Sequence, residues 1–141
     1  MNDRYFDLAV AANFLITNDA DERTYLEQYF GKQPDEYQSA RFFSMRQVVH
    51  MFYATVFLLL GSAGKPIRQS ENRPSFDYFH RKIWSGEIDL SDNDLKIVYG
   101  RVHWDPLVRN LRQTRFDEAL GIVSARNTSR GDVRLLLPSA Q

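Results

Sequence analysis

The sequence has no cysteine, no net charge and no apolar run long enough to span a membrane. Without cysteine, disulfides and thiolate metal sites are excluded, which suits a reducing cytoplasm. Eighteen basic and eighteen acidic residues cancel, so the charge favours neither nucleic acid nor an anionic membrane as a partner. The first residues also lack the basic stretch and apolar core of a signal peptide. We therefore expect a cytoplasmic protein.

The longest apolar run covers residues 48–60 (VVHMFYATVFLLL) and is shorter than the roughly 20 residues that a membrane helix needs. We expect it to lie in a core helix that is covered on all sides. With 141 residues, of which 43% are hydrophobic and 26% charged, the chain has the composition of one globular domain. Helical signals dominate and no strand-like alternation extends beyond a few residues, which predicts an all-α fold.

Capping signals predict the boundaries of the helices in the first half of the chain. A first helix covers residues 3–16. Asp19, with Glu22 three residues further on, is expected to cap a second helix that ends at Gly31. Pro34 then opens a long helix that continues to residue 60.

Similar signals divide the second half. Ser75 is expected to cap a short helix over residues 75–84, and a capping box of Ser91 and Asp94 opens the next helix. Asp105-Pro106 indicates the start of a new segment, and a last helix runs from residue 114 to residue 124. We therefore expect a helical unit over residues 1–124, followed by a mobile tail over residues 125–141.

Three kinds of apparent site favour structural interpretations. Residues 61–66 (GSAGKP) lack the spacing of a phosphate loop, and residues 89–94 (DLSDND) lack the glycine and glutamate of a calcium loop. Both stretches are better explained by helix capping. His50, His80 and His103 have no second ligand at helical spacing, so we interpret them as core or surface residues. No catalytic residue and no metal ligand is predicted.

Aromatic and acidic residues are concentrated in residues 75–84 (SFDYFHRKIW). Phe76, Asp77, Tyr78 and Trp84 could form a pocket for a cationic substrate, because aromatic faces and a carboxylate attract an ammonium group. The alternative is that these side chains only pack the helix against its neighbour.

Three segments taken in order resemble a known family: MNDRYFDLAVAANF (1–14), DERTYLEQYFG (21–31) and ARFFSMRQVVHMFYATVFLLLG (40–61). Together they are similar to the C-terminal half of the choline kinase and aminoglycoside phosphotransferase family. The match covers residues 1–62 well and residues 75–124 loosely. In that family a catalytic loop, H-x-D-x-x-x-x-N, and an Asp-x-Glu metal-binding strand precede a helix that begins with aromatic-Asp-Leu-Ala.

Asp7 lies in the aromatic-Asp-Leu-Ala match. The first helix is apolar on nearly every face, which predicts that it is buried and that the Asp7 carboxylate has a partner. The resemblance implies that this carboxylate anchors the backbone of the catalytic loop. Because that loop lies upstream of Met1 in the family, we expect a fragment in which Asp7 faces water or a local cap.

The resemblance implies a helical, substrate-side lobe of an ATP-dependent small-molecule kinase that phosphorylates choline or a similar alcohol. Its substrate pocket would combine residues of the long helix with residues of the short helix over 75–84, namely Tyr53, Phe57, Phe76, Asp77, Tyr78 and Trp84. ATP and Mg²⁺ serve the full-length family, but we expect neither to bind this fragment, and we expect no activity. Its partners would be the alcohol, the missing N-terminal lobe or a second copy. The alternative function is a free-standing helical protein-interaction module without catalysis.

Overall fold

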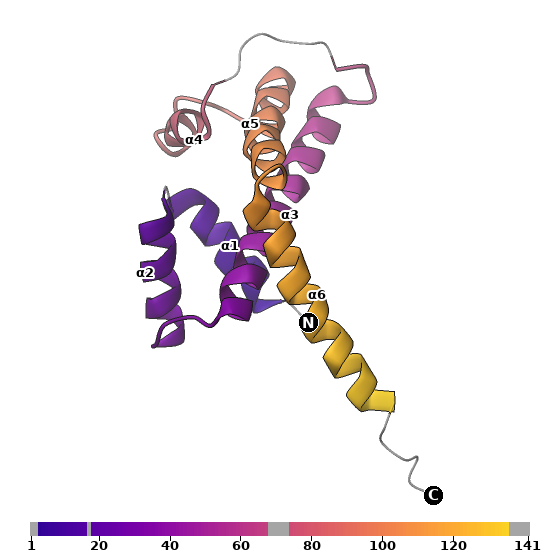
Figure 1. Cartoon of the computed structure of the whole chain (residues 1–141). Helices are drawn as coiled ribbons and strands as arrows, with labels where there is room; N and C mark the ends of the chain where they lie inside the picture. Colours follow the sequence, from indigo (N-terminus) through magenta and orange to yellow (C-terminus); the bar gives the residue numbers. More distant parts are fainter. Residues whose placement is uncertain (1–2, 17, 68–73, 136–141) are drawn as a thin grey trace, which may run out of the picture.

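The structure, a computed structural model, describes residues 3–16, 18–67 and 74–135. Within these ranges it contains six helices and no strand, which confirms the all-α class. The helices are α1 (Arg4–Leu15), α2 (Asp19–Phe30), α3 (Glu36–Ser62), α4 (Phe76–Trp84), α5 (Asn93–Leu111) and α6 (Thr114–Leu135). Figure 1 shows α3 and α5 side by side at the centre, with α1, α2 and α4 to one side and α6 projecting from one end of the pair.

Side-chain caps start the first three helices. Asp3, Asn18 and Asp35 cap α1, α2 and α3 by accepting hydrogen bonds from backbone N–H groups in the first turn. The predicted cap Asp19 is therefore wrong by one residue, because Asn18 supplies the accepting oxygen. Pro34 precedes the cap Asp35 instead of occupying the first turn of α3.

The fourth helix has its predicted cap, Ser75, but the fifth differs from expectation in two respects. Asp92 caps α5, whereas Ser91 donates its hydroxyl to the preceding Asp89. The helix also continues through Pro106, so the predicted start of a new segment at this proline is wrong. Proline removes one hydrogen bond from a helix. We attribute the continuity of α5 to its extensive packing along α3.

The last helix is longer than the sequence predicts. It was expected to end at residue 124, but α6 continues to Leu135, so the predicted tail is helical as far as that residue. No proline interrupts the chain between residues 114 and 137, and each added residue can complete a further backbone hydrogen bond. Residues 136–141 lie outside the described residues.

Two glycines allow α3 and α5 to approach each other closely. A Cβ atom on Gly100 of α5 would lie 2.9 Å from the backbone nitrogen of Leu58, and one on Gly61 of α3 would lie 2.9 Å from the backbone nitrogen of Ile97. A methyl group fits at neither position, because the obstructing atoms belong to the backbone. The absence of side chains at these glycines thus sets the distance between the two central helices.

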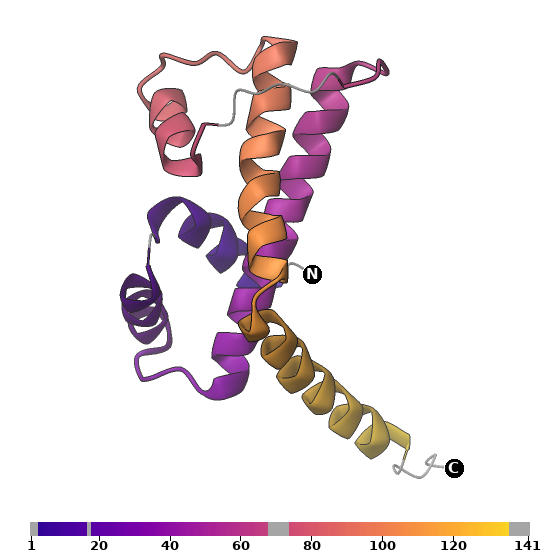
Figure 2. The same ribbon diagram turned by 45° about the horizontal axis from the view of Figure 1, so that its top comes forward.

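Three apolar cores surround this helix pair. The buried residues of the first come from α1, α2 and α3, those of the second from α3 and α6, and those of the third from α4 and α5. They are, in that order, Tyr5, Leu8, Ala12, Ile16, Leu26 and Phe42; Ala40, Phe43 and Ala119; and Phe79, Tyr99 and Val102. Figure 2 shows the resulting asymmetry, with α1, α2 and α4 on the same side of the α3–α5 pair.

The prediction that residues 48–60 are covered on all sides is wrong. Val48, Met51, Phe52 and Leu59 lie at helical spacing on one face of α3 and are 42, 50, 51 and 68% exposed. We call these four residues the uncovered apolar face. By length and composition α3 could cross a membrane, and 28% of its most apolar stretch is buried. The four residues stay uncovered because α1, α2 and α4 lie on the other side of the α3–α5 pair (Figure 2).

Candidate functional site

Aromatic and histidine side chains from four helices gather on the covered side of the α3–α5 pair. We call this group the aromatic–histidine cluster; its members are Phe14 of α1, His50, Tyr53 and Phe57 of α3, Phe76 and His80 of α4, and Tyr99 and His103 of α5. The Phe76 ring lies 5.2 Å from the His80 ring and 5.0 Å from the His103 ring, measured between centroids. Tyr53 stacks on His103 at 4.9 Å. The cluster thus joins α3 to α4 through a histidine of α5.

Two of the histidines are in direct contact. The Nδ1 atoms of His50 and His103 lie 3.1 Å apart, and both side chains are buried. The Nε2 atom of His103 is also buried, and it has no hydrogen-bond partner. An orphaned N–H donor would be costly there, so Nε2 is best left unprotonated. His103 then donates from Nδ1 to Nδ1 of His50, and the proton of His50 resides on its own Nε2.

The cluster is electrically neutral at neutral pH. Burial lowers the pKa of His50 to about 3, with further lowering by the charges of Arg46 and Arg109. Burial also lowers the pKa of His103 to about 2, and it lowers the pKa of His80, where the carboxylate of Asp77 opposes the shift. All three histidines are core residues, one of the two alternatives expected from the sequence, and they lie together in one cluster. Within the described ranges, no group of three or more acidic or histidine side chains is arranged to hold a metal ion.

A cleft of about 450 Å³ opens beside the cluster. We call it the polar cleft, because amide, acidic and basic side chains make up most of its wall. Its lining includes Asn13, Asp19, Arg46, Gln47, His50, Phe76, Asp77, Arg109, Asn110 and Arg115. These residues come from all six helices, and His50 and Phe76 belong to both the cluster and the cleft.

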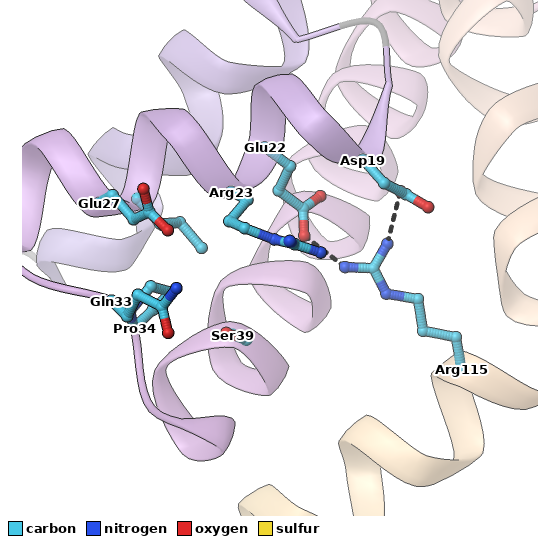
Figure 3. A pocket seen from close by; sticks show the side chains of 9 residues that line it. Asp19, Glu22, Arg23, Glu27, Gln33, Pro34, Ser39 and Arg115 are labelled. Atoms are coloured by element: carbon cyan, nitrogen blue, oxygen red, sulfur yellow. Dashed lines mark hydrogen bonds and ion pairs between the residues drawn. The ribbon is translucent and has the colours of Figure 1, made fainter.

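A buried glutamate organises one wall of the polar cleft. Glu22 is 5% exposed and accepts hydrogen bonds from both Arg46, at 2.8 Å, and Arg115. Arg115 also donates to Asp19, and Figure 3 shows it reaching from α6 to both acids of α2 across a neighbouring pocket of about 390 Å³. Asn13 accepts from Nε of Arg46 at 2.8 Å. Glu22 therefore serves this network rather than the predicted capping box.

Two charged residues of the cleft have no such partner. Neither the Asp77 carboxylate of α4 nor the Arg109 guanidinium of α5 makes a hydrogen bond or ion pair with another described residue. Both line the polar cleft, and both are exposed at its mouth.

The structure brings together four of the six predicted pocket residues. Tyr53, Phe57 and Phe76 belong to the aromatic–histidine cluster, and Asp77 lines the adjoining cleft. Tyr78 and Trp84 point outward from α4 and are 47 and 77% exposed. Tyr78 lies on a different side of the helix from Phe76. Trp84 lies one turn beyond His80, with ring centroids 6.4 Å apart, but most of its side chain is outside the cluster.

Asp7 is exposed and makes no hydrogen bond or ion pair with any residue that the structure describes. The interpretation of the first helix as apolar all round, and of Asp7 as buried with it, is therefore wrong for this chain. The packed side of α1 carries Tyr5, Leu8 and Ala12, and Asp7 lies on the opposite side. Asp7 faces water, which is one of the two alternatives expected for it.

The spacing H-x-D-x-x-x-x-N does occur in the chain, at His103–Asn110, which lies after the three segments that resemble the family. Here it forms part of the continuous helix α5. His103 is buried in the cluster and Asn110 donates to Gln47, whereas Asp105 does not line the polar cleft. A catalytic loop needs its aspartate at the reacting group, so this match does not form one.

Comparisons of the chain with protein-family models, with curated proteins and with solved structures find no match. The all-α fold and the geometry described above are therefore the observations on which a function can be argued.

Proposed function

We propose that this chain is the helical, substrate-side lobe of an ATP-dependent small-molecule kinase similar to the choline kinase and aminoglycoside phosphotransferase family. In this proposal the lobe binds an alcohol that carries an ammonium group, such as choline. Phosphoryl transfer also requires Mg²⁺ ligands and an aspartate that orients the hydroxyl. A separate catalytic part would supply these groups together with the ATP site, and Asp7 would anchor its catalytic loop.

One observation carries the proposal: the two segments that the resemblance assigns to the substrate pocket meet in space. Tyr53 of α3 and Phe76 of α4 both contact the ring of Phe14 and the ring of His103. The segments are more than twenty residues apart in sequence, and the two aromatic residues meet beside a cleft large enough for a small molecule.

The charges at this end of the cleft suit a cation. The Asp77 carboxylate has no basic partner among the described residues, and it lines the same cleft as the aromatic ring of Phe76. An ammonium group between a carboxylate and an aromatic ring gains from both. The neighbouring histidines stay neutral and add no repulsion.

Titration of the isotope-labelled chain with choline, followed by NMR, tests the proposal. We expect saturable shifts of resonances from Phe76, Asp77 and Tyr53. Asp77→Asn should weaken binding about fivefold, as expected for loss of one exposed charge pair. Asp117→Asn removes an exposed acid from the first turn of another helix and serves as the matched control. Absence of saturable binding, or equal effects of the two substitutions, would contradict the proposed pocket.

The uncovered apolar face favours a second candidate, a helical module that binds another protein. Exposed apolar patches of this kind often mark interaction sites. The two candidates differ in a simple respect: the module needs the uncovered face and not the polar cleft. Phe52→Lys should abolish partner binding by a module, and it should leave choline binding by a substrate lobe unchanged.

A further inference from the structure

Among the described residues that line it, the polar cleft has one unpaired charge of each sign. Arg46 and Arg115 of the cleft both pair with Glu22 of the neighbouring pocket, and Arg115 also pairs with Asp19 of the cleft. These four residues therefore neutralise one another. Asp77 and Arg109 remain. They lie on different helices, line the same cleft and form no ion pair with each other. Unpaired opposite charges on the walls of one cleft are complementary to a ligand that carries both charges.

His50 lines the same cleft as these two residues. Its ring contacts the ring of Phe76, the neighbour of Asp77, with centroids 5.5 Å apart. It also experiences the positive charge of Arg109. The contact with His103 places the proton of His50 on Nε2, and this atom has no partner among the described residues. His50 therefore presents an N–H donor to the interior of the cleft.

We propose that the polar cleft binds a small zwitterion, with its acid group at Arg109 and its ammonium group at Asp77 beside Phe76. A hydroxyl or other oxygen between the two ends accepts a hydrogen bond from His50. This inference rests on the proposed function for the hydroxyl and the ammonium group, and it adds the acid group. The substrate class is thereby narrowed from amino alcohols to hydroxylated amino acids and betaines.

Three commercially available probes separate the contributions of the ligand's acid group and ammonium group to binding. Carnitine carries a trimethylammonium group, a hydroxyl and a carboxylate; choline lacks the carboxylate, and 3-hydroxybutyrate lacks the ammonium group. Dissociation constants come from NMR titration of the full chain at one salt concentration. We expect carnitine to bind roughly fivefold more tightly than either of the other probes, because each exposed charge pair contributes modestly.

Single substitutions assign each end of the ligand. Arg109→Gln should weaken carnitine and 3-hydroxybutyrate about fivefold and leave choline unchanged, whereas Asp77→Asn should weaken carnitine and choline and leave 3-hydroxybutyrate unchanged. His50→Asn keeps a polar atom near the position of Nδ1 but removes Nε2, so it should weaken all three probes. Arg112→Gln, next to the cleft-lining part of α5, is the control for charge. Thermal unfolding of each variant confirms that it is folded.

The outcomes distinguish this inference from the proposed function. If choline binds in an Asp77-dependent manner but carnitine binds no more tightly, the zwitterion inference is wrong and the substrate lobe stands. The same holds if Arg109→Gln affects choline as strongly as carnitine. If none of the three probes binds, both proposals fail. If carnitine binds as described but no kinase sequence accompanies the gene, the site stands and the kinase assignment falls.

Discussion

Acidification should destabilise the fold through the buried histidine pair. His50 and His103 have pKa values of about 3 and about 2 in the folded chain, far below the usual value of 6.5. At any pH between about 3 and 6.5, the unfolded chain therefore binds more protons than the folded chain. The stability that the neutral imidazoles contribute is fully present above pH 6.5, and it is lost progressively as the pH falls from there towards 3.

The magnitude follows from the shift itself. At pH 5, about 1.5 pH units below the unfolded-state pKa of about 6.5, an imidazole is almost fully protonated in the unfolded chain. Because it stays neutral in the folded chain, it lowers the free energy of unfolding by about 2 kcal/mol. Two such imidazoles cost about 4 kcal/mol, a large part of the 5–15 kcal/mol that is typical of a domain. His80 acts in the same direction. Most carboxylates titrate below this range, so the histidines dominate between pH 8 and pH 5.

Urea unfolding followed by circular dichroism at pH 8, 7, 6 and 5 measures this loss. An independent measurement is the NMR titration of the imidazole C–H resonances in the folded chain, which we expect to show no protonation of His50 or His103 down to pH 5. Protonation of either ring with a midpoint near 6.5 in the folded state, or a stability that does not change with pH, would refute the reasoning.

Four further predictions concern other parts of the molecule. Gly100→Ala should destabilise the chain by about 1–3 kcal/mol through overpacking against α3, whereas Gly121→Ala, where a Cβ meets nothing within 4 Å, should stabilise it by about 0.4–1 kcal/mol in thermal unfolding. Asp7→Ala should cost this chain less than about 1 kcal/mol, and a full-length family member about 1–3 kcal/mol for each orphaned N–H; equal large losses would mean that Asp7 has an internal partner. The purified chain should show no phosphoryl transfer from ATP and Mg²⁺ to choline, and turnover abolished by a point mutation within it would contradict this. The uncovered apolar face should make the chain self-associate in light scattering, and Phe52→Lys should reduce the association; a wild-type chain that stays monomeric at high concentration and binds no hydrophobic dye would refute it.

The helices were predictable because their start and stop signals are local. Ser75 and Gly31 act within one turn of their own position, so neighbouring residues suffice to identify them. Pro106 misled the prediction because its intrinsic effect opposes a helix, and packing along α3 overrides it.

The candidate site was only partly predictable, because its geometry depends on how helices pair. His50 and His103 are 53 residues apart, and no periodicity within α3 or α5 indicates that they touch. Gly61 and Gly100 are the available signal, since a glycine inside a helix often marks a close approach, and each lies on the contact between α3 and α5. The role of Arg109 depends on the absence of an acidic partner, which a sequence does not reveal.

The proposed kinase assignment is tested most directly by reading the transcript upstream of the codon for Met1. We expect an H-x-D-x-x-x-x-N motif followed by Asp-x-Glu, either in frame with this chain or separated from it by a single frameshift. That arrangement would place the catalytic loop immediately before the helix that contains Asp7. An unrelated gene that ends well before Met1, with neither motif in any frame, would contradict the kinase lobe and favour the interaction module.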